Sequence, residues 1–211
     1  MGHLVLLGDS IFDNAAYVQG GPDVVAQLRE ALPRGWRASL LAVDGAVTRG
    51  VPDQLRRIPT DTTLLVVSVG GNDALGAAHV LSHPAGSVAE AVGLLASVQE
   101  RFAADYRTMV EALADAGLPA ALCTIYDTRI EEPDGRVIRS ALSLFNDEIT
   151  RCAFSRGMPL IDLRLICAED EDYANPIEPS VLGGAKIAAA IARLASSSPQ
   201  DWRRPLVVAV G

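Results

Sequence analysis

Histidine is scarce in this chain of 211 residues. There are only three, His3, His79 and His83, so any mechanism that requires a histidine must use one of them. Basic residues are also few: 18 lysines and arginines against 26 acidic residues give a formal net charge of -8, and no basic cluster is present. An acidic chain without such a cluster is a poor partner for nucleic acid or an anionic membrane surface, and we expect it to bind neither.

Cysteine is scarce as well. Cys123, Cys152 and Cys167 are odd in number and widely spaced, and no two of them form a Cys-x-x-Cys pair. The sequence therefore favours a reducing compartment and argues against a disulfide framework or a structural zinc site. No run approaches the ~18 apolar residues of a membrane span, and the apolar run at residues 4–7 is shorter than a signal peptide requires. We expect a cytoplasmic protein without a membrane span.

The distribution of apolar residues predicts the fold class. Hydrophobic residues make up 49% of the chain and charged residues 21%, a balance typical of a globular domain. Short apolar runs without polar alternation indicate parallel strands buried on both faces, at residues 4–7, 38–43, 63–69, 120–125 and 160–163. Helical patterns lie between them, at residues 23–32, 52–58, 87–116, 139–156 and 183–196, the last capped by Ser180. This alternation predicts a three-layer α/β/α domain.

Two segments fall outside the alternation. We expect one domain over residues 1–195, followed by a tail over residues 196–211 in which residues 205–210 are strand-like. The tail could add an edge strand to the sheet, or it could pack against a second copy of the chain and form a homodimer. We interpret the acidic run at residues 169–172 as a solvated surface loop.

Polar, glycine-bearing turns follow the first three predicted strands. They are Gly-Asp-Ser at residues 8–10, Asp-Gly-Ala at residues 44–46 and Gly-Gly-Asn-Asp at residues 70–73. Each alone could be a helix cap or a tight turn, but parallel strands bring all three to one edge of the sheet, where ligands bind. The Ser10 hydroxyl, a backbone N–H beside Gly45 and the Asn72 amide are together the components of a nucleophile with an oxyanion hole. The sequence has no Gly-x-Ser-x-Gly nucleophile elbow, which argues against the common α/β-hydrolase arrangement.

With these motifs the chain resembles the SGNH or GDSL hydrolases, a family of esterases, lipases and related acyl-processing enzymes, over roughly residues 3–195. The resemblance implies a flavodoxin-like α/β/α sandwich with a parallel five-stranded sheet. It implies a small-molecule ester or other acyl substrate and no metal or organic cofactor. It also implies that Ser10 is the nucleophile, and that the backbone N–H groups of Ser10 and Gly45 and the side chain of Asn72 form the oxyanion hole.

The last motif departs from the family pattern, which has Asp-x-x-His before the final helix. Here Asn175 stands in place of the aspartate and Glu178 in place of the histidine. A solvated glutamate is a weak base at neutral pH, but burial can raise its pKa, and an asparagine beside it adds no second negative charge. We therefore hypothesise a Ser10–Glu178 dyad in which Asn175 orients the glutamate.

Other arrangements stay open at this point. Glu178 could instead cap the final helix or pair with an arginine, and either His79 or His83 could enter the site from the segment after Asn72. Loops near residues 12–20, 74–90 and 126–136 are expected to form the pocket walls. Further candidate pocket residues are Asp9, Asp13, Asn14 and Asp73, of which Asp9 is expected mainly to fix its turn.

The sequence favours a serine hydrolase or acyltransferase that acts on an ester or acyl substrate. The alternatives are a catalytically inactive SGNH-like protein that binds a small molecule, and a non-hydrolytic enzyme that uses Glu178 as an acid–base group.

Overall fold

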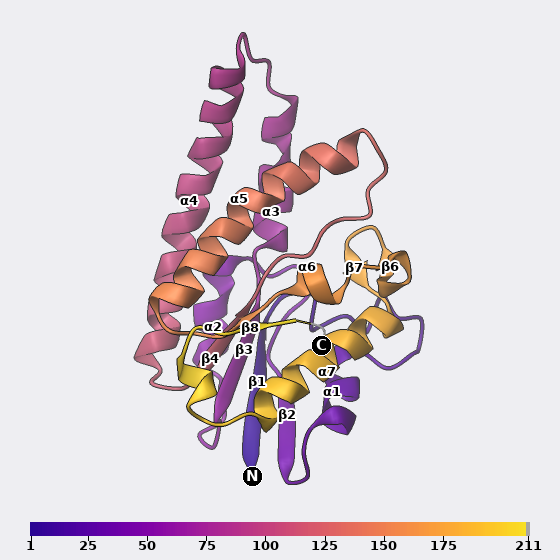
Figure 1. The fold of residues 1–211 in the computed structure, drawn as a ribbon, viewed down its shortest axis with the longest axis vertical. Helices are drawn as coiled ribbons and strands as arrows, with labels where there is room; N and C mark the ends of the chain where they lie inside the picture. Colours follow the sequence, from indigo (N-terminus) through magenta and orange to yellow (C-terminus); the bar gives the residue numbers. More distant parts are fainter. Residues whose placement is uncertain (210–211) are drawn as a thin grey trace.

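The computed structural model describes residues 1–209 and contains a six-stranded parallel sheet with helices on both faces (Figure 1). The strand order is β2-β1-β3-β4-β5-β8, and every neighbouring pair is parallel. The strands are β1 Gly2–Gly8, β2 Trp36–Leu40, β3 Leu64–Ser68, β4 Ala120–Cys123, β5 Leu160–Ile161 and β8 Val207–Val208. The predicted α/β/α class is thus confirmed.

The sheet has six strands rather than five because the C-terminal tail adds β8 to its edge. The Leu160 N–H donates to the Leu206 carbonyl at 2.7 Å, and the Asp162 N–H donates to the Val208 carbonyl at 2.9 Å. Of the two alternatives for the tail, the structure shows the added edge strand; Val210, at the end of the predicted run, lies outside the described residues. β2 also differs from its prediction. It ends at Leu40, where the regular ladder stops because the N–H groups of Leu41 and Ala42 both donate to the Leu6 carbonyl. The turn that contains Gly45 follows.

Helices cover the two faces of the sheet. α1 Val24–Ala31 and α7 Val181–Ser196 lie on one face, and α4 Val88–Asp115 and α5 Asp134–Ser155 pack together on the other (Figure 1). The shorter helices α2 Val51–Leu55 and α3 Gly71–Ala77 share the α4 side, and α6 Leu163–Ile166 contacts α7. Short 3₁₀ helices lie at Thr48–Gly50, Ala78–Ser82, Asp170–Asp172 and Asp201–Arg203. No helix within residues 1–209 is both long enough and apolar enough to span a bilayer.

The helix ends follow ordinary capping chemistry. The side chains of Asp23, Ser87 and Ser180 each accept a hydrogen bond from a backbone N–H in the first turn of α1, α4 and α7. The cap at Ser180 confirms its prediction. α5 begins at Asp134, five residues before the predicted start, with Pro133 at the N-cap position and no side-chain cap.

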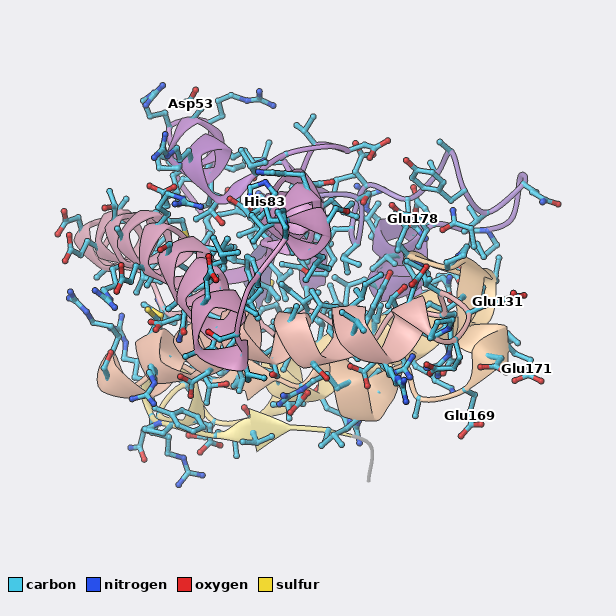
Figure 2. The ribbon with its side chains drawn as sticks, turned by 90° about the horizontal axis from the view of Figure 1, so that it is seen from above. Asp53, His83, Glu131, Glu169, Glu171 and Glu178 are labelled. Atoms are coloured by element: carbon cyan, nitrogen blue, oxygen red, sulfur yellow. The ribbon has the colours of Figure 1, made fainter. Side chains whose placement is uncertain are left out.

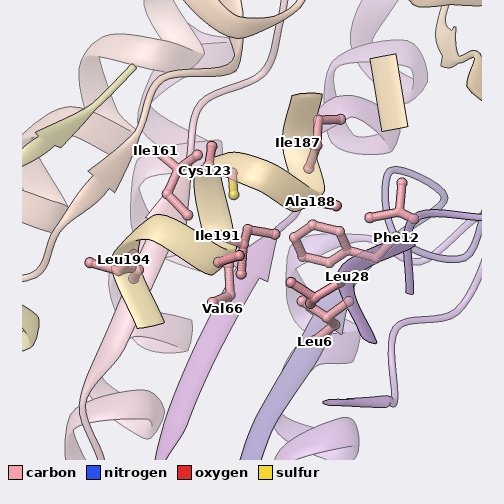
Figure 3. Packing of buried hydrophobic residues seen from close by; sticks show 14 of the residues in the cluster. Leu6, Phe12, Leu28, Val66, Cys123, Ile161, Ile187, Ala188, Ile191 and Leu194 are labelled. Atoms are coloured by element: carbon pink, nitrogen blue, oxygen red, sulfur yellow. The ribbon is translucent and has the colours of Figure 1, made fainter. Parts of the chain in front are cut away.

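The strands are apolar throughout because both of their faces are buried. Leu6 and Val66 pack on the side of α1 and α7, near Phe12, Leu28 and Ile191 (Figure 3). The intervening strand residues face α4 and α5 in a second cluster, which includes Leu7, Val67, Phe102, Tyr106 and Phe145. The core therefore fixes the directions of β1 and β3, and with them the positions of the turns that follow these strands.

A two-stranded antiparallel hairpin, β6 Tyr173–Asn175 and β7 Glu178–Pro179, precedes α7 and was not predicted. The acidic run at residues 169–172 comes before the hairpin. We expected it to be a solvated loop, but it is partly buried. Asp172 is buried, and its carboxylate pairs with the ammonium group of Lys186 at 2.7 Å. The Ser180 N–H also donates to the Asp172 carbonyl at 2.8 Å. These contacts join both ends of the hairpin to the start of α7.

Gly8 sets how closely β1 approaches β3 at the end where the polar turns meet. Its φ is +120°, and a Cβ at this position would overlap the backbone carbonyl of Ser68. The buried Gln54 side chain holds the same peptide on both sides, since it accepts from the Gly8 N–H at 2.7 Å and donates to the Gly8 carbonyl at 2.8 Å. A residue with a side chain therefore cannot occupy position 8 without displacing backbone.

We predict that Gly8→Ala lowers the free energy of unfolding by about 2–4 kcal/mol, because it combines backbone strain with overlap in a packed core. Urea denaturation followed by circular dichroism measures the change. Gly50→Ala is the matched control: Gly50 has a negative φ and open space around its Cβ position, so its effect should stay within about 0.5 kcal/mol. Equal stability of the two variants would contradict this account.

Candidate active site

A serine and a glutamate from opposite ends of the chain meet at the carboxyl edge of the sheet. Ser10 follows β1 and Glu178 begins β7, and the Ser10 hydroxyl donates a hydrogen bond of 2.9 Å to Oε1 of Glu178. The two residues are 7% and 6% exposed. Seen from above, Glu178 lies inward of Glu169 and Glu171, whose side chains point away from the molecule (Figure 2). The structure thus brings together the two residues that the sequence motifs singled out.

The environment of Glu178 makes its carboxylate a stronger base. Burial raises the pKa of Glu178 to about 7, the hydrogen bond from Ser10 acts against this rise, and the nearby Asp44 carboxylate adds to it. Oε1 is occupied by Ser10, whereas the buried Oε2 has no hydrogen-bond partner among residues 1–209. Glu178 is also one of the residues that line the active-site cavity described below.

Asn175 does not orient Glu178, contrary to the hypothesis from the sequence. Its side chain is exposed, and Oδ1 accepts a hydrogen bond of 3.0 Å from the Ile177 N–H within the hairpin turn. Backbone contacts hold the hairpin instead. The Tyr126 hydroxyl donates to the Ile177 carbonyl at 2.8 Å, and the Thr128 hydroxyl donates to the Pro176 carbonyl at 3.0 Å. No sequence motif marks these two residues, because each binds a backbone carbonyl rather than a partner side chain.

The turn that contains Gly45 is joined to the turns on both sides of it. The Ala46 N–H donates to the Val43 carbonyl at 3.0 Å, and Gly45 has a φ of +77°, so a glycine suits the turn. The Val43 N–H donates to the Gly8 carbonyl at 3.0 Å, and the Asn72 side chain donates to the Ala46 carbonyl at 3.0 Å. The three predicted turns therefore form one hydrogen-bonded assembly.

The donors expected of an oxyanion hole are placed in this assembly. Among the described residues, the backbone N–H groups of Ser10 and Gly45 donate to no protein acceptor. Asn72 lies in the first turn of α3 and lines the cavity beside Ser10. The Asn72 amide nitrogen also carries a second hydrogen besides the one it donates to Ala46. Gly45, unlike Ser10 and Asn72, is not among the residues that line the cavity.

Of the two further candidate carboxylates, Asp9 and Asp73, only Asp9 lines the cavity. Asp9 is 3% exposed and lines the cavity, and its Oδ1 accepts from the Ile11 N–H at 3.2 Å, which fixes the turn as expected. Burial raises the pKa of Asp9 to about 8. The hydrogen bond from Ile11 opposes this rise, and the charge of Glu178 adds to it. Asp73 accepts from the Thr48 N–H at 2.9 Å and from its hydroxyl at 3.0 Å, and burial raises its pKa as well.

Asp13 and Asn14 support the site without lining the cavity. The Asp13 carboxylate accepts from the Asp44 N–H at 3.0 Å, which holds the turn of Gly45 from its outer side. Asn14 is fully buried and bridges two segments: its Oδ1 accepts from the Val24 N–H at 2.9 Å, and its Nδ2 donates to the Pro179 carbonyl at 3.3 Å. Their roles are therefore in positioning the turn and the hairpin.

None of the three histidines, all of which the structure describes, reaches Ser10. His79 and His83 are exposed on the segment after α3, with ring centroids 5.8 Å apart, and neither lines the cavity. His3 is buried near the start of β1, where its ring contacts Asp61 at 2.9 Å and Ser39 at 2.8 Å, far along the strand from the site. The alternative in which a histidine enters the site is thus not supported by this arrangement.

A largely apolar cavity of about 140 Å³ extends from the dyad. Its polar end includes Asp9, Ser10, Asn72 and Glu178, and its remaining walls come mainly from apolar side chains of α3, α4, α5 and the 3₁₀ helix Ala78–Ser82. Two of the three predicted wall segments, residues 74–90 and 126–136, contribute side chains. The segment at residues 12–20 does not, because it turns away to pack against α1 and the hairpin.

Comparison with known proteins agrees with this geometry. Residues 6–183 match the model of the GDSL-like Lipase/Acylhydrolase family. An extracellular lipase from Streptomyces rimosus has a similar structure, with a TM-score of 0.66 and 17% identity, covering 92% of this chain and 100% of the lipase. A phospholipase A1 from Streptomyces albidoflavus NA297 gives a TM-score of 0.66 and 16% identity, with 93% and 99% covered. The comparison with curated proteins gives no match.

The family match includes the turns of Ser10, Gly45 and Asn72 and the hairpin of Glu178. The esterase EstA from Pseudoalteromonas sp. has the same fold, with a TM-score of 0.61 and 17% identity, covering 93% of this chain and 100% of the esterase. Sequence motif, strand-end geometry and family match all refer to the same residues. The chain therefore belongs to the GDSL-like lipase/acylhydrolase family.

Proposed function

We propose that the protein hydrolyses an ester substrate with Ser10 as the nucleophile and Glu178 as the general base. Family membership supports an ester-cleaving serine hydrolase. The observation that carries the finer assignment is the 2.9 Å hydrogen bond from the Ser10 hydroxyl to the buried carboxylate of Glu178. A nucleophile within hydrogen-bond reach of a base is the arrangement that covalent acyl transfer requires.

In the acylation step, Oγ of Ser10 bonds to the ester carbonyl carbon while its proton moves to Oε1 of Glu178. The carbonyl oxygen becomes an oxyanion, stabilised by the Ser10 and Gly45 N–H groups and the Asn72 amide. The bond to the alcohol then breaks, and protonated Glu178 returns its proton to the departing oxygen. Water then adds to the acyl carbon while Glu178 accepts its proton. The bond between the acyl carbon and Oγ of Ser10 breaks, Glu178 returns the proton to Oγ, and the free acid leaves.

Glu178 can serve as base because its pKa is close to that of a histidine. An ordinary glutamate, with a pKa of about 4.3, takes a proton from serine too weakly, whereas an imidazole titrates at about 6.5. The pKa of Glu178, about 7, lies in the latter range and near the operating pH, where general base catalysis is most efficient.

An acyltransferase would use the same acyl-enzyme, with an alcohol in place of water as the acceptor. The non-catalytic alternative, a binding protein with this pocket, differs in having no reactive serine. Labelling by a fluorophosphonate probe distinguishes it from both enzymes, because the probe forms a covalent bond only with an activated hydroxyl.

We predict that Ser10→Ala abolishes both fluorophosphonate labelling and hydrolysis of p-nitrophenyl butanoate. Glu178→Gln should lower kcat/KM by about 10²–10⁴-fold, since an amide cannot accept the serine proton. Glu131→Gln is the matched control, because Glu131 is exposed and points away from the site (Figure 2). Activity that survives Ser10→Ala would exclude the mechanism, and an unchanged rate in Glu178→Gln would exclude only the base.

The acid limb of the pH profile should report Glu178. Its carboxylate must be deprotonated to accept a proton, so kcat/KM for the butanoate ester should fall about tenfold per pH unit below pH about 7 and level off above it. A histidine base would give a similar limb. The double variant His79→Asn, His83→Asn should therefore retain the profile of the wild type, and loss of the limb in that variant would assign it to a histidine.

The alkaline limb should report Asp9, whose pKa is about 8. Above that pH a second negative charge would lie beside Glu178 and the oxyanion, so kcat/KM should decline. Asp9→Asn retains an acceptor for the Ile11 N–H but cannot ionise, and we expect it to remove the decline while the acid limb stays. A decline that persists in Asp9→Asn, measured at the same ionic strength, would show that another group causes it.

A further inference from the structure

A buried asparagine joins helix α5 to the segment that follows β4. Asn146 lies on α5 and is 2% exposed. Its Oδ1 accepts from the Ile125 N–H at 2.8 Å, and its Nδ2 donates to the Ile125 carbonyl, also at 2.8 Å. Gln54 holds Gly8 by the same pair of bonds at the end of β1. Each amide side chain therefore fixes one residue of backbone at the point where a strand ends.

The segment that Asn146 holds has no regular structure of its own. Residues 124–130 form neither helix nor strand. The N–H of Thr124 still donates to the Ile161 carbonyl of β5 at 3.1 Å. At the next residue, Ile125, the partners are the amide groups of Asn146. From this residue onward the position of the segment therefore depends on α5 rather than on the sheet.

This segment also holds the hairpin that carries Glu178. The Tyr126 hydroxyl donates to the Ile177 carbonyl at 2.8 Å, and the Thr128 hydroxyl donates to the Pro176 carbonyl at 3.0 Å. Ile177 directly precedes Glu178 in the sequence. Figure 1 shows the link between β4 and α5 passing beside the β6–β7 hairpin. A continuous series of contacts therefore runs from α5 through this link to the residue before Glu178.

Loss of the Asn146 side chain would release the first contact in this series. The N–H and the carbonyl of Ile125 would each lose a partner, and a buried main-chain group left unpaired costs about 1–3 kcal/mol. The backbone would then shift toward other partners, and Tyr126 would move with it because it is the next residue. A displacement of about 1 Å at a catalytic group is enough to lower a rate about 100-fold.

We propose that Asn146 is a positioning residue for the catalytic base. Its two bonds to Ile125 keep Tyr126 in place, and Tyr126 in turn keeps the hairpin of Glu178 against Ser10. This inference rests on the proposed role of Glu178 and adds to it a residue that acts from α5. Asn146 is not among the residues that line the cavity, so its effect on the reaction is transmitted through Ile125 and Tyr126.

The pH profile distinguishes this role from a general contribution to stability. Burial raises the pKa of Glu178 to about 7, so a hairpin that moves and admits water should lower this pKa toward the ordinary value of about 4.3. The acid limb of kcat/KM would then move to lower pH. The ionisable groups that interact with Glu178 include Asp9, Asp44, Tyr17 and Tyr126, and a substitution at position 146 leaves all four in the chain. A loss of stability alone would reduce the amount of folded enzyme without moving the limb.

The test measures kcat and KM for p-nitrophenyl butanoate over the acid limb. Asn146→Leu removes both hydrogen bonds at similar side-chain size. It should lower kcat about 10–100-fold with little change in KM, and move the acid limb of kcat/KM down by about one pH unit. Asn146→Gln keeps the amide but sets it one methylene group farther from the backbone. It should cause smaller changes in the same direction, and it decides the test if Asn146→Leu does not fold.

Glu148→Gln is the matched control. Glu148 lies on the same helix and is 8% exposed, and its carboxylate binds Gln99 at 3.2 Å and Arg107 at 3.4 Å, both on α4. Its substitution should lower the stability measured by urea denaturation and leave kcat and the acid limb unchanged. A kinetic change in Glu148→Gln similar to that in Asn146→Leu would assign the effect to a looser α5 and overturn the proposal.

Tyr126→Phe tests the next contact in the series, because it removes the hydroxyl that binds the Ile177 carbonyl. Effects that pass through the same contacts are not additive, so Asn146→Leu combined with Tyr126→Phe should lower kcat less than the product of the two single effects. A full product would exclude the series of contacts while the esterase function stays intact. Wild-type kcat and acid limb in folded Asn146→Leu, or in Asn146→Gln where the first variant does not fold, would exclude it as well. A wild type that neither hydrolyses the ester nor reacts with a fluorophosphonate would instead reject the proposed function.

Discussion

The burial of one carboxylate governs the design of this site. Glu178 must leave water to approach Ser10, and removing a carboxylate from water costs free energy, which its raised pKa of about 7 reflects. The hairpin that carries it must therefore be held firmly by other contacts. Tyr126 and Thr128 bind its carbonyl groups from one side, and Asn14 binds it from the other. The burial that costs this free energy also raises the pKa of Glu178 and so makes its carboxylate a stronger base.

The anchoring of the hairpin extends into α7. The chain has a single lysine, Lys186, and the structure pairs it with the buried Asp172 directly before the hairpin. A buried carboxylate that loses its partner is strongly destabilising, so this pair constrains where the hairpin starts. Ser180 constrains where it ends, since it caps α7 and its N–H binds the Asp172 carbonyl. The position of Glu178 relative to the sheet is thus set by α7, which in turn packs on α1 and the sheet core.

The sequence predicted the part of the site that follows from sheet geometry. Ser10, Gly45 and Asn72 lie in the segments that follow β1, β2 and β3, and parallel strands bring such segments to one edge of the sheet. The direction of the Asn175 side chain has no such rule. In a short turn, an asparagine can bind the backbone two residues ahead, and this local bond to Ile177 replaces the expected contact with Glu178.

The separation of Asn175 from Glu178 is consistent with the chemistry of a carboxylate base. An imidazole has two distinct nitrogens, and a second group must hold the ring in the tautomer that leaves the correct nitrogen free. A carboxylate has two equivalent oxygens and no tautomer to select, so a glutamate base needs to be positioned but not paired. The hydrogen bonds from Tyr126, Thr128 and Asn14 to carbonyl groups of the hairpin position the glutamate. Once glutamate occupies position 178, an acidic partner at position 175 would only repel it, and the residue there is free to stabilise its own turn.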